Sequence, residues 1–304
     1  MKALITGGAG FIGSNIAIKL LEMDFEVRIL DDLSSGYKSN IPEGAEFIEG
    51  SVVDSDVTKA AADGVDYIFH LAASVGNKRA IDNPISDATI NVLGTLNVLE
   101  AARATGVKKL VYSSSAGIFG ELKTIPIKED HPRDPDSPYG VSKLAAEKDC
   151  LAYMKLYNIP VVCLRYFNVF GVHQRFDAYG NVIPIFADRI LKGIPITIFG
   201  DGEQTRDFVN AKDVAQANIK SALSEATGVF NVGSASRITI NHLAKLMEKV
   251  SGVSVGIEYG PERPGDVRDS LADVSKAREA FGFDPSSDIE SGLREYMGWI
   301  SKDA

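Results

Sequence analysis

Hydrophobic and polar residues follow two different periods along the first half of the chain. Short apolar runs, typical of buried strands, lie at residues 2–6, 26–30, 45–48, 67–71, 109–113 and 161–166. Segments with apolar positions three and four apart, the spacing of a helix face, lie at residues 11–23, 91–104 and 139–156, and another helix ends near Ala60. Strands that alternate with helices require parallel pairing, with right-handed crossovers placing helices on both faces. This half predicts an α/β fold with a Rossmann-like, doubly wound parallel sheet.

The second half of the chain is more mixed. Helical spacing recurs at residues 181–191, 213–223, 240–250 and 289–300, and strand-like runs lie at residues 196–199 and 229–232. No repeat, low-complexity tract or free linker separates this half from the first. We therefore expect a smaller, mixed α/β C-terminal domain that packs directly on the sheet.

Composition narrows the class of protein. The chain has 304 residues, a net charge of −9 and no basic run, which argues against a nucleic-acid partner. Its two cysteines, Cys150 and Cys163, belong to no metal-ligand cluster and fit a reducing compartment, so we predict no metal site. We find neither a signal peptide nor an apolar stretch long enough to span a membrane. These observations predict a cytoplasmic protein with no membrane partner.

A glycine motif, GGAGFIG, lies between the first predicted strand and the first predicted helix. Gly7, Gly10 and Gly13 permit a tight turn and let a pyrophosphate approach the backbone and the helix N-terminus. Asp31 closes the second strand about 20 residues later, where a carboxylate can hold a ribose diol. A carboxylate there repels a 2′-phosphate, and no Arg follows in residues 32–36. The motif therefore predicts NAD as the cofactor.

A second constellation carries acid–base chemistry. Tyr139 and Lys143, in YGVSK, lie one helical turn apart, so both point from the same face. A lysine ammonium and a positively charged nicotinamide ring would lower the pKa of the phenol, which could then accept a hydroxyl proton. Ser115, at the end of the preceding strand, could bond the same oxygen. These three residues are the predicted catalytic set.

Seven motifs appear in one order along nearly the whole chain: TGGAGFIGS, HLAA, SSSAGIFG, YGVSK, RYFNVFG, GDGEQTRDF and RPGDVRDSLAD. This order resembles the extended short-chain dehydrogenase/reductase family that acts on nucleotide sugars, in particular its UDP-glucose and UDP-N-acetylglucosamine 4-epimerases. The resemblance implies an NAD-binding Rossmann domain over residues 1–166, with about 208–232. It implies a nucleotide-sugar-binding domain over residues 167–207 and 233–304. It also implies a homodimer through a bundle of the helices that carry Asn91 and Tyr139.

The resemblance and the two motifs together assign the site residues. The residues expected to bind the cofactor are Gly7, Gly10, Phe11, Ile12, Gly13, Asp31, Ser51, Val52, Leu71, Ala72, Ala73, Asn91, Ser113, Tyr139, Lys143 and Tyr166. The residues expected to bind the UDP-sugar are Ser115, Tyr139, Asn168, Asn181, Val182, Thr197, Phe199, Arg206, Arg263, Asp266 and Ser270. Ser51 stands where the family often has an acidic residue against the adenine, which predicts weaker retention of NAD.

The residues after Ser115 favour one reaction. Family dehydratases and decarboxylases carry a carboxylate there, whereas this chain has Ala116 and Gly117. Oxidation at C4, rotation of the 4-keto sugar and return of the hydride need no such group, so we hypothesise 4-epimerisation of UDP-glucose and UDP-galactose. Ser270 is small where a bulky aromatic can block N-acetyl groups, which predicts that N-acetylhexosamines are accepted as well.

Two other functions remain open at this point. One is another NAD-dependent nucleotide-sugar enzyme, either a UDP-glucuronate epimerase or a keto-sugar reductase; Asp31 disfavours the NADPH that a reductase would consume. The other is a non-catalytic NAD-binding protein. The complete Ser115, Tyr139 and Lys143 set argues against it, because a binding protein needs no such set.

Overall fold

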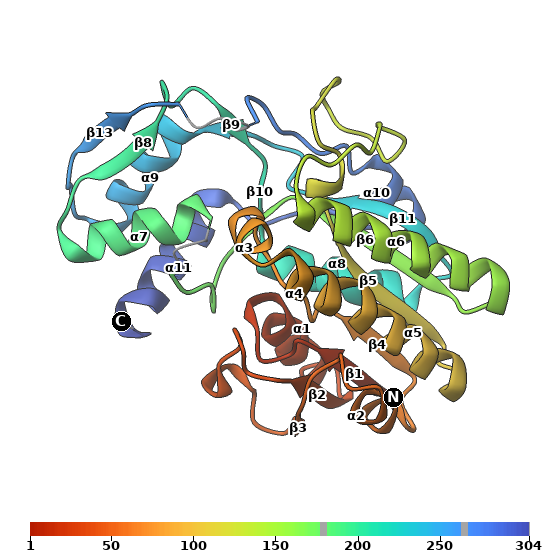
Figure 1. Cartoon of the computed structure of the whole chain (residues 1–304). Helices are drawn as coiled ribbons and strands as arrows, with labels where there is room; N and C mark the ends of the chain where they lie inside the picture. Colours follow the sequence, from red (N-terminus) through yellow and green to blue (C-terminus); the bar gives the residue numbers. More distant parts are fainter. Residues whose placement is uncertain (177–180, 263–266, 304) are drawn as a thin grey trace.

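The central feature is a parallel sheet, seen edge-on at the right of Figure 1. The computed structural model describes residues 1–176, 181–262 and 267–303. The sheet contains β1 (Lys2–Thr6), β2 (Glu26–Asp31), β3 (Glu46–Glu49), β4 (Tyr67–His70), β5 (Lys109–Ser115), β6 (Val161–Tyr166) and β11 (Gly228–Val232). All pairs are parallel and the order is β11-β6-β5-β4-β1-β2-β3. The order reverses beside β1, and ligands of doubly wound folds bind at the carboxyl ends of strands at this point. The predicted fold class is confirmed.

Helices cover both faces of the sheet (Figure 1). One layer holds α1 (Phe11–Leu21) and α8 (Ala211–Leu223), and the other holds α2 (Ser55–Ala62), α5 (Gly94–Thr105) and α6 (Pro138–Tyr157). Successive strand residues point to opposite faces, so Ile5 joins the first hydrophobic cluster and Leu4 the second. The near-continuous apolar strands are the result of this two-sided burial.

The start of α6 is fixed by local chemistry. The Ser137 side chain caps the helix by accepting a hydrogen bond from the Gly140 amide at 3.2 Å, and Pro138 occupies the first turn, where its missing N–H costs nothing. Asn158, in the left-handed conformation, ends the helix. These signals place Tyr139 in the first turn of α6, at the carboxyl edge of the sheet.

A third hydrophobic cluster forms what we call the outer lobe, at the upper left of Figure 1. Its elements are α7 (Val182–Lys192), β8 (Ile196–Phe199), α9 (Ile240–Ser251), β13 (Ile257–Gly260) and α11 (Ile289–Asp303). Three small pairs complete the architecture: β7 (Asn168–Phe170) with β10 (Phe208–Asn210), β9 (Thr205–Arg206) with β12 (Ile238–Thr239), and β8 with β13. α10 (Ser275–Phe281) packs beside β11.

The structure differs from the sequence prediction in its short elements. The strands β7, β9, β10, β12 and β13 and the helices α3 (Asn77–Asp82), α4 (Pro84–Ala88) and α10 are too short to show a period. The prediction of one helix over residues 91–104 was wrong at its start. The chain is already helical in α4 and passes through a π-helical turn, Thr89–Leu93, before α5. A π turn shifts the apolar spacing, so the pattern does not continue regularly into the helical residues that precede it.

Within the described ranges, no helix has both the length and the apolar character that a membrane crossing requires.

Candidate active site

The glycine loop joins β1 to α1 in a conformation too tight for a residue with a side chain at Gly7 or Gly13. Gly7 has φ +71°, and a Cβ there would lie 2.6 Å from the amide nitrogen of Ala72. A Cβ on Gly13 would lie 2.2 Å from the carbonyl oxygen of Gly7. Gly10 is the N-cap of α1, and no side chain of the described residues caps it. The helix N-terminus is thus open to an anion, as the pyrophosphate of NAD requires.

Asp31 ends β2 beside this loop. Its carboxylate accepts hydrogen bonds from the amides of Ala9, at 3.0 Å, and Leu33, at 2.8 Å. Burial raises the pKa of Asp31, and these two bonds oppose the rise. A Cβ on Gly36 would lie 2.8 Å from its Oδ1, so the chain turns back tightly over the carboxylate. The donor and acceptor groups present here therefore fit the ribose of NAD.

The other predicted cofactor residues surround the same edge. Leu71, Ala72 and Ala73 follow β4 and are partly exposed beside Gly7. Val52 is buried, whereas Ser51 before it is partly exposed. Phe11 and Ile12 open α1. Ser113 lies on β5 and hydrogen-bonds the hydroxyl of Tyr166 at the end of β6, and that hydroxyl also donates to Asn218 at 2.9 Å.

Ser115 and Tyr139 meet where η3 (Ala116–Ile118) follows β5. The two side chains share a hydrogen bond. Their approach depends on two glycines, because a Cβ on Gly117 would lie 3.3 Å from Ser115 Oγ, and one on Gly140 would lie 2.4 Å from the Gly117 carbonyl oxygen. From the sequence, Gly117 was interpreted as a position without a carboxyl group. The structure shows that both glycines bring α6 against η3.

The ionisable groups of the catalytic set depend on burial and neighbours. Burial raises the pKa of Tyr139, the Ser115 hydrogen bond lowers it and the Asp87 charge raises it. Burial lowers the pKa of Lys143 to about 8. The Lys143 Nζ lies 4.5 Å from the ring centre of Tyr112. An additional positive charge near the phenol would lower the pKa of Tyr139, and a nicotinamide ring supplies one.

Asn91 lies in the π turn and links the segment after β4 to α6 by hydrogen bonds. Its Nδ2 lies within hydrogen-bond distance of Ser74 O, at 3.0 Å, Asp87 Oδ1, at 3.1 Å, and Ser142 Oγ, at 2.9 Å, and its Oδ1 accepts from the Ser74 amide at 2.8 Å. The Ser142 hydroxyl in turn donates to Asp87 Oδ2 and lies 3.0 Å from the Tyr139 carbonyl oxygen. The structure thus connects the predicted Asn91 to α6 through Asp87 and Ser142. Sequence reasoning missed both, although Asp87 is one helical turn before Asn91.

A buried ion pair holds α6 to the sheet one turn beyond Lys143. Arg165 on β6 donates to Glu147 through Nε at 3.0 Å and Nη2 at 2.7 Å, and both side chains are 0% exposed. Ser114, next to Ser115, donates to the same carboxylate at 2.7 Å. Bidentate geometry and a third donor satisfy both oxygens, as a buried carboxylate requires. The pair therefore fixes the register of α6 against β5.

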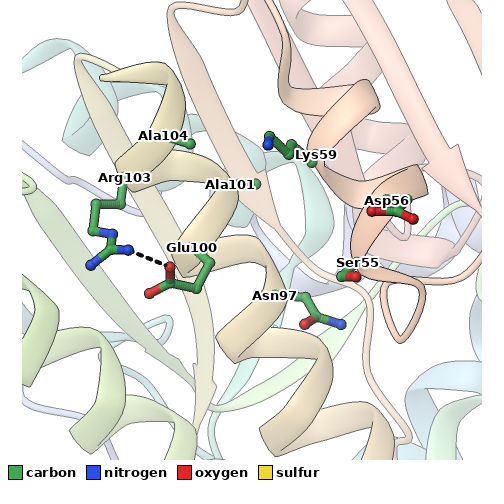
Figure 2. Close-up of a pocket in the computed structure, with 8 residues that line it drawn as sticks. All are labelled: Ser55, Asp56, Lys59, Asn97, Glu100, Ala101, Arg103 and Ala104. Atoms are coloured by element: carbon green, nitrogen blue, oxygen red, sulfur yellow. Dashed lines mark ion pairs between the residues drawn. The ribbon is translucent and has the colours of Figure 1, made fainter.

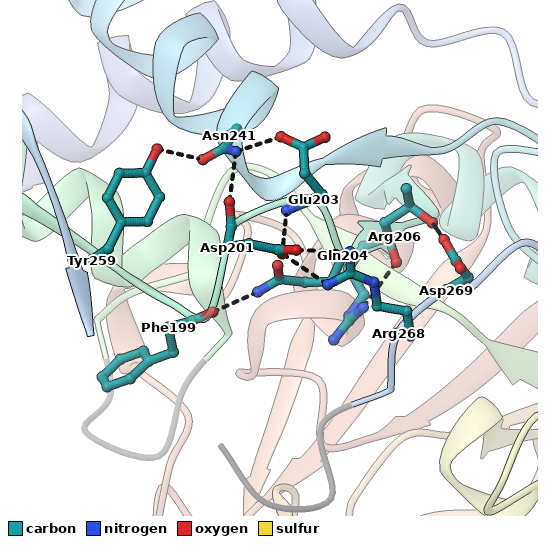
Figure 3. A network of polar contacts seen from close by, with 10 residues as sticks. Phe199, Asp201, Glu203, Gln204, Arg206, Asn241, Tyr259, Arg268 and Asp269 are labelled. Atoms are coloured by element: carbon teal, nitrogen blue, oxygen red, sulfur yellow. Dashed lines mark hydrogen bonds and ion pairs between the residues drawn. The ribbon is translucent and has the colours of Figure 1, made fainter. Parts of the chain in front are cut away.

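Figure 3 shows two of the predicted nucleotide contacts, Phe199 on β8 of the outer lobe and Arg206 on β9. Phe199 ends β8, and its carbonyl accepts from Gln204 at 2.8 Å. Arg206 lies on β9, which is held by the bond from Thr205 Oγ1 to Asp269 Oδ1. Figure 3 also shows Arg268 in a bidentate pair with Asp201, at 2.8 and 2.9 Å. This pair joins the turn after β8 to the segment that follows residue 266.

The remaining described substrate residues are distributed over four segments. Asn168 begins β7, and its side chain donates to the Asp207 carbonyl at 3.1 Å. Asn181 and Val182 are at the start of α7, and Thr197 lies on β8. Ser270 is buried, with 8% exposed. The predicted residues Arg263 and Asp266 lie outside the described residues.

A separate pocket lies on the helical layer, between α2 and α5 (Figure 2). Its lining is Ser55, Asp56, Lys59, Asn97, Glu100, Ala101, Arg103 and Ala104. It includes an exposed ion pair, Glu100–Arg103, and none of the predicted site residues. The predicted catalytic and cofactor residues lie at the carboxyl edge of the sheet and not in this pocket.

Comparisons with known proteins agree with this geometry. The NAD dependent epimerase/dehydratase family matches residues 3–233. A protein described as a putative UDP-glucose 4-epimerase of Methanocaldococcus jannaschii is 40% identical over 98% of this chain and 97% of its own length. The UDP-N-acetylglucosamine 4-epimerase of Methanobrevibacter ruminantium, solved with UDP-N-acetylmuramic acid, has a TM-score of 0.95 at 37% identity, covering 100% of this chain and 99% of that one. The Thermus thermophilus UDP-glucose 4-epimerase, solved with NAD, has a TM-score of 0.92 at 35% identity and covers both chains fully.

Proposed function

The chain belongs to the NAD-dependent epimerase/dehydratase family, an enzyme family whose cofactor is NAD, and within it we propose that the protein is a UDP-hexose 4-epimerase. The proposed reaction interconverts UDP-glucose and UDP-galactose. The observation that supports this reaction is the absence of a carboxyl group at the two positions after Ser115. Ala116 and Gly117 supply no carboxyl group, and Gly117 lies against both Ser115 and the Tyr139 ring. A dehydratase needs an acid–base partner at this place, whereas a 4-epimerase does not.

The proposed mechanism uses the three catalytic residues in turn. Bound NAD supplies the chemistry of a reversible hydride acceptor at C4 of the sugar. Tyr139 takes the proton of the 4-hydroxyl, and Ser115 holds the oxygen through its hydrogen bond. The Lys143 charge stabilises the phenolate. After the 4-keto sugar turns over, the hydride would return to the opposite face of C4, and Tyr139 returns the proton to the 4-oxygen.

We propose that the outer lobe binds the UDP group. Arg206 suits a diphosphate through charge-assisted hydrogen bonds, and the β9 strand that carries it is held by Thr205 and Asp269. Phe199 is partly exposed at the end of β8 and can stack on a base. Ser270 is small, which supports acceptance of N-acetylhexosamines. Residues 1–166 with about 208–232 would form the cofactor domain, and the rest of the chain the substrate domain.

We also propose a homodimer in which α5 and α6 meet their copies. Apolar side chains on or next to these helices are exposed: Leu93 by 53%, Val141 by 53% and Leu156 by 71%. Exposed apolar residues grouped on neighbouring helices favour a helical interface. Light scattering of the purified protein tests this proposal, and a monomeric mass at micromolar concentration would refute it.

Proton NMR of the purified protein with UDP-glucose, and separately with UDP-N-acetylglucosamine, tests the reaction without added NAD. The galacto product from UDP-glucose would support epimerisation with retained cofactor, and conversion of both sugars would support the Ser270 argument. A stable keto sugar would refute the assignment. No conversion after NAD is supplied would also refute it and would favour a UDP-glucuronate epimerase or a non-catalytic protein.

A further inference from the structure

Residues 172–175, which we call the strap, cross from the outer lobe to the cofactor site. On the outer-lobe side, the Gln174 carbonyl accepts from the Tyr296 hydroxyl at 2.8 Å, and His173 packs against Trp299. On the cofactor side, His173 Nδ1 lies 2.8 Å from Ser14 Oγ, and the Val172 carbonyl accepts from Asn15 at 3.0 Å. Because Ser14 and Asn15 belong to the first turns of α1, the strap lies directly over the helix that begins at the glycine loop.

Arg175 makes the most extensive contacts of the strap. Its guanidinium pairs with Asp303 at the end of α11 through two nitrogens. Its Nη1 donates to Asn40 Oδ1 at 2.8 Å, and its Nη2 lies 3.4 Å from Ser39 Oγ. The guanidinium also lies 4.0 Å from the ring centre of Tyr37, within cation–π range. The Arg175 side chain is 15% exposed, so these contacts are only weakly screened by water.

Asn40 transmits this contact to the glycine loop. It is 3% exposed, and its Nδ2 donates to the Ala9 carbonyl at 3.0 Å. The Tyr37 amide donates to the same carbonyl at 3.0 Å, while the Ala9 amide donates to Asp31. Ala9, between Gly8 and Gly10, is therefore held at both of its backbone polar groups. Its amide is bound by Asp31, the carboxylate expected to hold the ribose, and its carbonyl is bound by Asn40. Glycines impose no conformation of their own, so such a loop depends on external bonds for its shape.

We infer that Arg175 is a positioning residue that holds the glycine loop in its cofactor-binding shape through Asn40 and thereby slows the release of NAD. The outer lobe then contributes to cofactor retention although it carries none of the predicted NAD contacts. The inference depends on the NAD dependence of the family and not on the identity of the sugar.

The release rate of the cofactor tests the inference directly. Protein loaded with NADH is mixed with excess NAD, and the loss of bound NADH fluorescence gives the dissociation rate. We expect Arg175→Gln to release NADH roughly tenfold faster, the change that loss of a hydrogen bond to a charged group can produce. Arg175→Lys should fall between wild type and Arg175→Gln, because lysine keeps the charge near Asp303 but lacks the fork that reaches Asn40 as well.

Lys212→Gln is the matched control. Lys212 on α8 pairs with Glu295 on α11 at 2.6 Å, so this substitution also removes one positive charge from a contact between the sheet helices and α11. It does not touch the glycine loop, and we expect the release rate to stay within twofold of wild type. An equal acceleration by Lys212→Gln and Arg175→Gln would overturn the inference, because general loosening of the outer lobe would then explain both. A rate within twofold of wild type for Arg175→Gln would overturn it as well.

A double-mutant cycle tests the route through Asn40. If Arg175 acts through this side chain, Asn40→Ala combined with Arg175→Gln should release NADH no faster than Asn40→Ala alone. If the two substitutions instead multiplied each other's acceleration of NADH release, the route from Arg175 through Asn40 would be refuted. Asp303→Asn, at an exposed position near the end of α11, perturbs the same chain from its other end and should give a smaller acceleration than Arg175→Gln. Because the readout is cofactor release, these results do not depend on whether any UDP-sugar is turned over.

Discussion

The contact between Gly140 and η3 predicts that one methyl group at the start of α6 disrupts catalysis. In Gly140→Ala, the new Cβ would lie 2.4 Å from the Gly117 carbonyl oxygen and 2.7 Å from Pro135 Cβ. Real Cβ atoms essentially never approach closer than 3.0 Å, so the first turn of α6 must move by about 0.6 Å or more. That turn carries Tyr139, whereas Ser115 stays on β5, so the shift acts on the hydrogen bond between them.

The expected size of the effect follows from this displacement. A misplacement near 1 Å can reduce turnover about 10²-fold, which corresponds to roughly 2.7 kcal/mol of activation free energy. We expect kcat of Gly140→Ala to fall by about that factor. The KM for UDP-glucose should change little, because the proposed nucleotide contacts lie away from the start of α6. Overpacking should also lower the free energy of unfolding by about 1–3 kcal/mol.

Gly298→Ala supplies the control for this experiment. Gly298 lies inside α11, and a Cβ there meets nothing within 4 Å among the described residues. The substitution should leave kcat unchanged and raise the free energy of unfolding by about 0.5–1 kcal/mol, because alanine favours the helix. Steady-state kinetics and urea denaturation measure both variants. A folded Gly140→Ala protein that retains kcat within threefold of wild type would refute the close-approach argument.

Three further predictions follow from the site. Tyr139→Phe should lower kcat by about 10²–10⁴-fold while the protein keeps its NAD, measured by turnover and by cofactor content; an activity loss below tenfold would contradict the proton-transfer role. Glu147→Ala should destabilise the fold by about 3–5 kcal/mol in urea denaturation, because it leaves the Arg165 charge buried without its carboxylate, and a loss below 1 kcal/mol would contradict this. Burial and the Arg175 charge lower the pKa of His173 in the folded protein, so its contribution to stability is present above about pH 6.5 and is lost as the pH falls below that value. Replacement of His173 by Asn should flatten the slope of unfolding free energy between pH 7 and 5, and an unchanged slope would exclude His173 as its source.

The sequence alone determined the parts of the fold and site that depend on local patterns. Strand and helix periods in the first half predicted the parallel sheet, because a period depends only on neighbours along the chain. The glycine motif and the YGVSK motif predicted the cofactor loop and the Tyr139–Lys143 pair for the same reason. One helical turn separates Tyr139 from Lys143, so their spacing in the sequence is enough to predict that both side chains point from the same face of the helix.

The tertiary structure alone decided which distant segments touch. The close approach of Gly140 to the Gly117 carbonyl, the buried Arg165–Glu147 pair and the bond from Arg175 to Asn40 all join segments whose distance is set by the packing of whole elements. Sequence spacing carries no record of these contacts, because the register of a helix on a sheet results from the sum of many side-chain volumes. The short strands were missed for a related reason: their backbone partners are distant in sequence, and each strand is too brief to impose a period of its own. The π turn before α5 was missed because a single turn interrupts the helical spacing without imposing a pattern of its own.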